Sequence, residues 1–511
     1  MPNHPSVPSL NTAAKAACAA LALGAALLIG SPAAAHVGRA STPVRATLTR
    51  PPGPPAPAEP DPTGRDAVTG PAYVPHEVLV GYAPGPAMVA AATIERRMGV
   101  RAVAGAGLAP RSRLLRLGRG ESVPSAIERL RRKPGIAYVK PNYIAHSAGA
   151  FFPNDPGRQG RTQGWERLQW NLLPITGVDA PEAWANLLGV GRPGGRGVTV
   201  AVLDTGVAYR DWKQFHQSPD FGRTRFVSPY DFVSNNAYPL DRNGHGTFVA
   251  GVVAESTNNG VALTGLAYGA SVMPVRILDA SGLGDEATIA KGIRYAVAHH
   301  AQIINLSLEF LPNEVTSASD IPEIVSAINF AHARGVMVVG AAGNDQSRQI
   351  AYPARAHGVV SVGATTKDVC LADYSNNGSS LSLVAPGGGS DAIMPSNPFC
   401  HPDRNLPSIY QLTLTSVPHW ARFGYPSYYI GTSMSAPEVS ATAALVIASG
   451  VIGPHPSPAQ LLTRLEQTAT PLGGSRPNPA YGYGIINAGN ATSRHPVISP
   501  STSPSSRPAL P

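Results

Sequence analysis

Apolar residues form two kinds of run along the chain, continuous ones and ones with helical spacing. Continuous runs rich in Val, Ile and Leu predict buried strands at 198–206, 271–278, 301–308, 335–344 and 359–365. Helical spacing between them predicts helices at 287–300 and 323–335. Continuous apolar strands separated by helices are typical of a parallel sheet covered on both faces. We therefore expect an α/β domain over residues 147–490, with three layers and a mostly parallel central sheet.

A smaller unit precedes this domain, at residues 71–146. Its pattern predicts a strand, a helix, a strand, a helix and a strand at 77–82, 91–99, 113–118, 125–133 and 136–143. This order resembles a βαββαβ arrangement of ferredoxin size. The sequence thus predicts a small α+β, ferredoxin-like domain ahead of the larger one.

The first 35 residues have the composition of a secretory signal peptide. Lys15 is followed by an apolar run over 16–29 and then by small residues up to Ala35. The alternative is a membrane anchor, but the run is shorter than the roughly 20 residues that span a bilayer. We expect cleavage after Ala35, a secreted product that is extracellular or periplasmic, and no stable membrane insertion.

Two stretches are too rich in proline, and too poor in apolar residues, to form a packed core. Residues 36–70 include the sequence TRPPGPPAPAEPDPTG and predict a linker. Residues 491–511 are rich in serine and proline and predict a disordered tail.

The net charge of +9 is unevenly distributed. Residues 71–146 carry 12 Lys and Arg against 4 Asp and Glu, a net +8, whereas residues 147–490 carry 21 against 24, a net −3. Opposite balances in two domains of one chain indicate that the domains bind each other, which argues against a nucleic-acid partner.

Two of the three cysteines remain after signal cleavage, Cys370 and Cys400. An oxidising destination favours a disulfide between them. Free buried thiols remain the alternative.

Polar residues that could take part in catalysis follow the predicted strands or begin predicted helices. Asp204, Glu309 and Asn344 come at strand ends, while His245 and Ser433 come at helix starts. The carboxyl ends of parallel strands form the ligand-binding edge of such a sheet. Each residue alone is explained as a turn former or a helix cap, so the functional interpretation depends on the set.

This set meets the needs of nucleophilic catalysis. A serine hydroxyl requires an imidazole base, and the imidazole requires a carboxylate that fixes its tautomer. Asp204, His245 and Ser433 occur in that order, separated by 41 and 188 residues. The side-chain amide of Asn344 and the backbone N–H of Ser433 are candidate donors to an oxyanion.

Four sequence strings carry a family resemblance: VAVLDTGV, NGHGTFVAG, AAGN and GTSMSAP. In this order they resemble the signatures of the subtilisin-like serine proteases, the subtilases. The resemblance implies a subtilisin-like fold and a secreted serine endopeptidase that acts through an acyl-enzyme intermediate. It implies that Asp204 orients His245, that His245 is the general base and acid, that Ser433 is the nucleophile and that Asn344 stabilises the oxyanion.

The resemblance also implies that substrates bind as an added strand. The implied substrate-binding residues are Ser281, Gly282, Leu283, Gly284, Leu306, Ser307, Leu308, Ala341, Ala342 and Gly343. Glu309 departs from the family, which usually carries glycine at this position. Its carboxylate either favours basic side chains in substrates or faces solvent.

Subtilases often bind structural calcium through a loop after the histidine helix. The sequence ESTNNGVALTG resembles that loop, which implies calcium ligands at Asn258 and Asn259, with Asp220 as a further ligand. No cofactor is expected to be required for the chemistry itself.

The small basic domain resembles the inhibitory propeptide of subtilases. This resemblance implies a self-processing zymogen that is cut between His146 and Phe152. Its own propeptide would act as an intramolecular inhibitor. Polypeptides are the expected substrates, and the enzyme is expected to be a monomer.

Three other interpretations fit the sequence less well. An α/β-hydrolase esterase or lipase requires the order Ser, acid, His and a glycine where Ser435 stands. A pseudoprotease that only binds peptides would lack a catalytic residue, but all four positions are filled. A dinucleotide site is not supported, because the glycines of GRPGGRG precede their strand.

Overall fold

The computed structural model describes residues 73–84, 100–102, 111–118, 121–143, 151–157, 164–394, 397, 400–402, 404–416 and 419–496. The predicted signal peptide at 1–35, the linker at 36–70 and the helix expected at 91–99 lie outside these residues, as does most of the expected tail.

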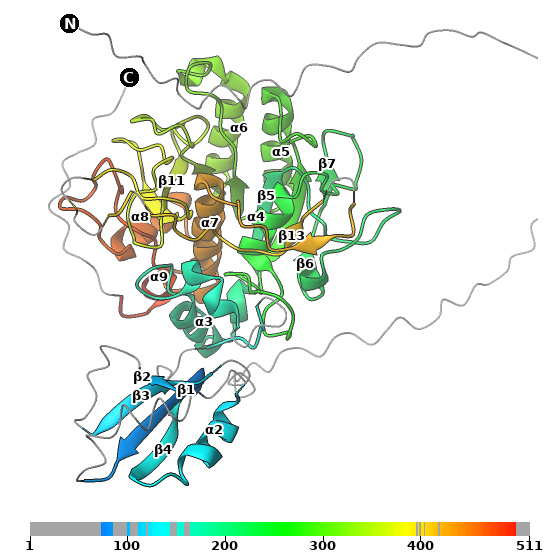
Figure 1. Ribbon diagram of the computed structural model, residues 1–511. Helices are drawn as coiled ribbons and strands as arrows, with labels where there is room; N and C mark the ends of the chain where they lie inside the picture. Colours follow the sequence, from blue (N-terminus) through cyan, green and yellow to red (C-terminus); the bar gives the residue numbers. More distant parts are fainter. Residues whose placement is uncertain are drawn as a thin grey trace, which may run out of the picture. The chain divides into compact units, whose positions relative to one another are not determined.

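The small domain is built on a four-stranded antiparallel sheet of order β2-β3-β1-β4 (Figure 1). Its elements are β1 (Tyr73–Tyr82), β2 (Arg101–Ala102), β3 (Ser112–Arg116), α2 (Val123–Leu130) and β4 (Ile136–Tyr143). Helix α2 begins two residues before its predicted start, because Ser122 caps it by accepting a hydrogen bond from Ser125 N. Val123, Ala126 and Leu130 turn inward and join the core of this domain.

The large domain contains an eight-stranded sheet whose strand pairs are all parallel. Its order is β12-β11-β10-β9-β5-β8-β6, with β7 also paired to β8. The strands are β5 (Thr199–Asp204), β6 (Arg225–Phe226), β7 (Tyr230–Asp231), β8 (Ser271–Arg276), β9 (Ile303–Leu306), β10 (Met337–Ala341), β11 (Val359–Thr365) and β12 (Leu383–Pro386). The expected mostly parallel central sheet is confirmed.

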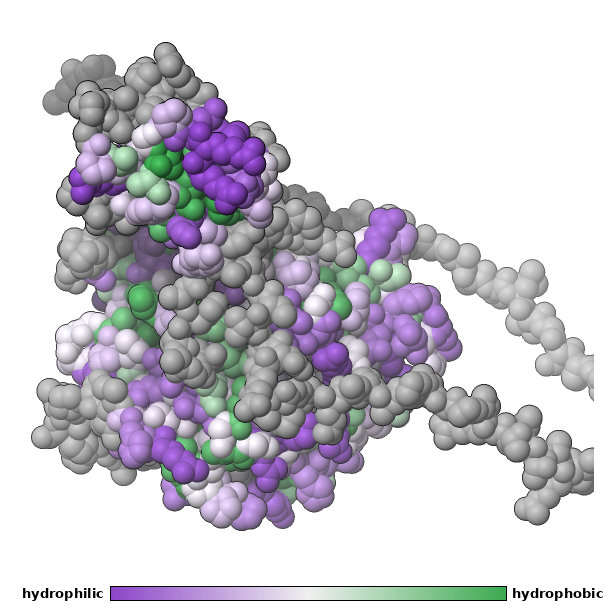
Figure 2. All heavy atoms as spheres, turned by 90° about the horizontal axis from the view of Figure 1, so that it is seen from below, coloured by the Kyte–Doolittle hydropathy of each residue, from purple (hydrophilic) through white to green (hydrophobic). Residues whose placement is uncertain are grey.

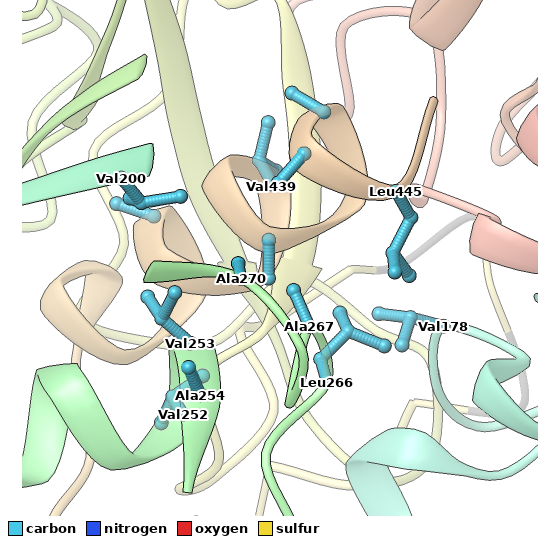
Figure 3. Close-up of a cluster of buried hydrophobic side chains, with 14 of the residues drawn as sticks. Val178, Val200, Val252, Val253, Ala254, Leu266, Ala267, Ala270, Val439 and Leu445 are labelled. Carbon is cyan, nitrogen blue, oxygen red and sulfur yellow. The ribbon is translucent and has the colours of Figure 1, made fainter. Parts of the chain in front are cut away.

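Helices cover both faces of this sheet. Helices α5 (Glu286–Ala298) and α6 (Pro322–Ala333) pack on one face with their own apolar core (Figure 1). Helices α4 (His245–Ala254) and α7 (Thr432–Ser449) pack on the other. Figure 3 shows small side chains of α4 and α7, such as Val253 and Val439, meeting Val200 of the sheet. These are the three predicted layers.

Further elements complete the domain. They are α3 (Ala180–Gly189), β13 (Thr413–Leu414), β14 (Phe423–Gly424), α8 (Pro458–Thr468), α9 (Ala488–Thr492) and short 3-10 helices at Trp165–Arg167, Trp170–Leu172, Pro193–Gly195, Pro219–Phe221 and Ala318–Asp320. Helix α9 continues past residue 490, with Ala491 and Thr492 buried, so the folded domain extends into the stretch expected to be tail.

The strand order changes direction at β5. The chain leaves β5 for β8 on one side and then returns to β9 on the other side of β5. Ligand sites of α/β sheets form at such a change of direction. Asp204 is the last residue of β5 and Ser307 follows β9, so both lie at this point.

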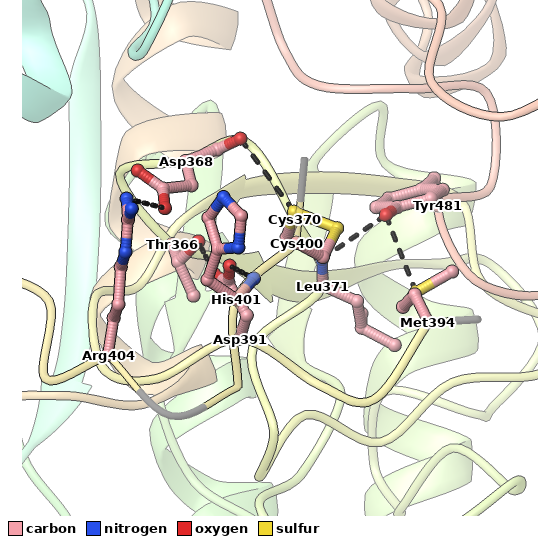
Figure 4. The surroundings of a disulfide bond; sticks show 10 residues. All are labelled: Thr366, Asp368, Cys370, Leu371, Asp391, Met394, Cys400, His401, Arg404 and Tyr481. Carbon is pink, nitrogen blue, oxygen red and sulfur yellow. Dashed lines mark hydrogen bonds and ion pairs between the residues drawn. A yellow bond between two sulfur atoms is a disulfide. The ribbon is translucent and has the colours of Figure 1, made fainter. Parts of the chain in front are cut away.

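A disulfide joins Cys370 and Cys400, which are 30 residues apart in the sequence. Figure 4 shows it beside Asp391, which accepts hydrogen bonds from Thr366 Oγ1 and from the backbone N–H of His401. Among the described residues, the side chains of Cys370, Asp391 and Cys400 form the one group of potential metal ligands whose ligand atoms lie close together. Because both sulfurs are in the disulfide, this cluster is not a metal site.

The surface drawn in Figure 2 is mainly hydrophilic, with hydrophobic side chains exposed in small groups. In the part of the chain that the structure describes, no helix combines the length and the apolar composition needed to cross a membrane.

Candidate active site

The end of β5 and the start of α4 bring a carboxylate and an imidazole together. His245 Nδ1 lies 2.8 Å from Asp204 Oδ1 and 3.0 Å from Oδ2. The Asp204 side chain is 1% exposed and that of His245 is 24% exposed. The carboxylate therefore holds a proton on Nδ1, and no described residue hydrogen-bonds Nε2, which is left to act on a substrate or nucleophile.

Close approach of α4 to β5 depends on Gly246. A Cβ at this position would clash with the carbonyl oxygen of Gly206 and would lie 3.0 Å from Asp204 Oδ1. Any larger residue would push the first turn of α4, and His245 with it, away from the sheet.

The surroundings raise the pKa of His245. Burial alone would lower it, but the charge and hydrogen bond of Asp204, with the charge of Asp241, outweigh burial and raise the pKa above its ordinary value of 6.5. An imidazole poised in this way can take and return a proton near neutral pH.

Asp241 is a residue of the site that sequence reasoning missed. Its buried carboxylate accepts hydrogen bonds from Thr205 Oγ1, the N–H groups of Asn243 and Gly244, and both N–H and Oγ1 of Thr247. These bonds tie the loop before α4 to the end of β5. The available signal was an aspartate shortly before a predicted helix start, because carboxylates near a helix N-terminus accept from its free N–H groups, as Asp241 does from Thr247 N.

Ser433 lies in the first turn of α7, as the sequence predicts. Its Oγ donates to Ser307 O at 3.3 Å, and its own carbonyl accepts from Ser307 Oγ at 2.9 Å. Within the described residues no hydrogen bond joins Ser433 Oγ to His245. The structure thus brings Ser433 to the stretch after β9, and it brings His245 to Asp204.

Asn344 is attached to the start of α7. Its Oδ1 accepts from Thr432 N at 2.8 Å and from Thr432 Oγ1 at 3.1 Å, next to Ser433 in sequence. Its Nδ2 donates to Glu309 Oε1 at 3.0 Å, and its backbone N–H donates to Glu309 Oε2 at 3.1 Å. Glu309 therefore does not simply face solvent.

The candidate substrate-binding stretches differ in how their backbones are bonded. In the first, Ser281 N and Leu283 N both donate to Asp279 Oδ1, so Ser281–Leu283 form a closed turn, with Leu283 70% exposed. Gly284 follows this turn. The other two stretches end β9 and β10, and these hold Leu306, Ser307, Leu308, Ala341, Ala342 and Gly343.

Two carboxylates meet the loop after α4, and one of them was not predicted. Asp220 accepts from Asn259 Nδ2 at 2.7 Å, whereas the unpredicted Asp155 accepts from the backbone N–H groups of Asn258 and Asn259. The Asn258 side chain instead accepts from Asn154 N. Asp155 stands in the segment PNDP, which the sequence pattern treats as a connection.

Both carboxylates have raised pKa values. Burial raises the pKa of Asp155 to about 7 and that of Asp220 to about 8. Neighbouring Glu255 is fully buried, and no described residue makes a hydrogen bond of standard geometry to its two oxygens. Oxygen donors with this excess of negative charge fit a hard divalent cation such as Ca²⁺.

Comparison with known proteins gives consistent results. Residues 195–484 match the sequence model described as the subtilase family, and residues 59–142 match the fervidolysin N-terminal prodomain. A thermophilic serine proteinase from Bacillus sp. (strain AK1) is 31% identical over 370 residues, which cover 72% of this chain and 76% of that protein. Subtilisin Savinase from Lederbergia lenta is 34% identical over 298 residues, 58% of this chain and 91% of that protein. A solved structure of proteases from Pseudoalteromonas arctica has a TM-score of 0.51 and 28% identity, covering 66% of this chain and 98% of that one.

Proposed function

The chain belongs to the subtilase family of serine proteases, and from this premise we propose that Asp204, His245 and Ser433 form its catalytic triad. The fold is subtilisin-like, and a prodomain precedes the protease domain. The observation that carries the proposal is the contact of His245 Nδ1 with the buried Asp204 carboxylate at 2.8 Å. It fixes the tautomer in which Nε2 is a base.

The proposed reaction is hydrolysis of internal peptide bonds. His245 Nε2 takes the proton of Ser433 Oγ as Oγ bonds to the scissile carbonyl carbon. His245 then gives that proton to the leaving amine, and the C–N bond breaks to leave an ester on Ser433. A water, deprotonated by His245, cleaves the ester and releases the acid and the free serine.

The negative oxygen of each tetrahedral intermediate needs donors. Asn344 Nδ2 is one candidate, since Asn344 is held beside Ser433 through Thr432. The backbone N–H of Ser433 is the second, because the first N–H groups of a helix such as α7 have no partner inside it.

Polypeptide substrates follow from this chemistry, and we infer that they bind as a strand between two segments. One is Gly284 and the turn before it. The other is Leu306–Leu308, with Ala341–Gly343 as a pocket wall; Ser307 supports this by its bonds to Ser433.

We further infer a zymogen that is secreted and processes itself. The prodomain match and the +8 against −3 charge balance support an inhibitor that docks on its own enzyme. Residues 1–35 supply the signal for export. Asp155, Asp220 and Asn259 would hold one structural calcium, which supplies positive charge to a buried acidic cluster and takes no part in peptide hydrolysis.

Two serines on α7 allow a matched test of the nucleophile. Ser433→Ala is expected to abolish casein hydrolysis. Ser435→Ala is expected to keep it, because Ser435 Oγ donates to the carbonyls of Ala385 and Pro386 away from the site. Casein cleavage by folded, purified Ser433→Ala would contradict the proposal.

A further inference from the structure

One carboxylate joins the loops that follow two neighbouring strands. Glu309 lies three residues after β9 and Asn344 three residues after β10, and these strands pair in parallel. Glu309 Oε2 accepts from the Asn344 backbone N–H, and Oε1 accepts from Asn344 Nδ2. Both oxygens of the half-buried Glu309 thus accept hydrogen bonds from Asn344, the residue proposed to stabilise the oxyanion.

The amide of Asn344 is held at both ends. Thr432 donates twice to its Oδ1, and Glu309 accepts from its Nδ2. An amide nitrogen carries two hydrogens, and among the described residues Nδ2 has no acceptor other than Glu309. Glu309 and Thr432 therefore fix the plane of the amide while one N–H stays available.

The backbone next to Asn344 leaves room for this carboxylate. Gly343 has φ +106°, and a Cβ there would lie 2.5 Å from Glu309 Oε2. A side chain at this position would displace the carboxylate from Asn344.

The site does not favour the charged form of Glu309. Burial raises the pKa of its carboxyl, and the charge of Asp345 raises it further. The hydrogen bonds from Asn344 oppose both effects. A solvent-facing carboxylate would avoid this cost, and the two hydrogen bonds from Asn344 offset part of it in the inward position.

Resting on the proposed oxyanion role of Asn344, we propose that Glu309 is a positioning residue that aims the free N–H of Asn344 at the oxyanion. A donor held in place before the reaction costs no reorganisation when charge develops. Its loss lowers kcat and leaves KM nearly unchanged, because the bond to the oxyanion is made in the transition state.

A double-mutant cycle tests this role. The processed enzyme and its Glu309→Ala, Asn344→Ala and double variants hydrolyse a peptide p-nitroanilide that carries no charge. Glu309→Ala is expected to lower kcat by about tenfold with KM within about twofold. In the Asn344→Ala background the same change is expected to cost nothing more. Glu309→Gln, which keeps the size and one acceptor, is expected to recover part of the lost kcat.

Glu314→Ala is the matched control, because it removes an exposed glutamate from the same loop; its kcat is expected to equal that of the wild type. Equal losses from Glu309→Ala in both backgrounds, or an effect on KM alone, would overturn the positioning role. A wild-type kcat for Asn344→Ala removes the oxyanion assignment and this proposal with it. If kcat falls in Asn344→Ala but not in Glu309→Ala, the positioning role of Glu309 is overturned and the oxyanion role of Asn344 stands.

Discussion

Among single residues, His245 must be in the right ionisation state for catalysis. As a base it must be neutral, and its environment raises its pKa above 6.5. Activity should therefore fall as the pH drops through this raised pKa. We expect the acidic limb of kcat/KM to have its midpoint above 6.5, measured from about pH 5 to 10 with an uncharged substrate.

The variant Asp204→Asn tests whether Asp204 causes the raised pKa of His245. It removes the charge and the acceptor that raise the pKa of His245, so residual activity should show a midpoint at lower pH. A flat profile between about pH 5 and 8 for the wild type would mean that His245 is not the base.

Asp241 gives a prediction on stability. Its buried carboxylate accepts five hydrogen bonds, and an amide in its place would turn a donor toward groups that also donate. Asp241→Asn should lower the free energy of unfolding by about 2 to 4 kcal/mol and reduce kcat. Thermal unfolding is the measurement, with exposed Asp211→Asn as control; equal stability of the two variants would contradict the role.

Single residues also show where sequence reasoning ends. Asp204, His245, Asn344 and Ser433 were predicted because each stands in a local string at the end of a strand or the start of a helix. Asp241 was missed although it stands in the string just before His245 and most of its hydrogen bonds are local. Asp155 and the contacts of Glu309, in contrast, depend on distant segments meeting. The hydrogen bonds of Asp155, for example, cross more than a hundred residues. No local pattern contains that information.

At the scale of elements, the five strands with continuous apolar runs were all predicted, and so were the helices between them. The short strands β6, β7 and β12 were not. β6 and β7 have two residues each, too few for an apolar run or an alternation to be recognised. β12 ends at Pro386, a residue that argues against a strand in the middle of a sheet. Their pairing follows from the sheet already formed by β8 and β11.

The predicted calcium site lies at the loop after α4. If a cation neutralises Asp155 and Asp220, its removal leaves buried like charges together. A chelator should then lower the melting temperature by about 5 °C or more, and added Ca²⁺ should restore it. Asp155→Asn should be less stable and should no longer respond to the chelator. Identical melting curves with and without chelator would show that no structural calcium is held.

At the scale of the whole molecule, the order of domains predicts where the chain is cut. Phe151 is 8% exposed and lies against Trp184 and Tyr268, with ring centroids 6.1 Å apart in both pairs. The processed enzyme needs this residue for its core. The cut expected between His146 and Phe152 should therefore precede Phe151.

Amino-terminal sequencing of the secreted protein measures this position. We expect a new amino terminus no later than Phe151 in wild-type material, and uncut precursor in Ser433→Ala. An active preparation that still carries its prodomain in one chain would contradict self-processing. The expectation of a monomer is a separate prediction, which sedimentation of the processed enzyme would check.

The order of a prodomain followed by a protease domain was predictable from the sequence. Proline-rich stretches and the change in charge balance separate the segments, because both properties are averages over many residues. The exact end of the large domain could not be predicted from the sequence. Helix α9 there is short, has no clear apolar face in its sequence and is held by the packing of Ala491 and Thr492.

The proposed triad makes Ser433 the nucleophile of a serine protease. Reaction of the processed enzyme with a fluorophosphonate, followed by mass spectrometry of its peptides, tests it most directly. We expect one label per chain, on Ser433, which is lost in Ser433→Ala and kept in Ser435→Ala. A label on another residue, or an active enzyme that takes no label, would contradict it.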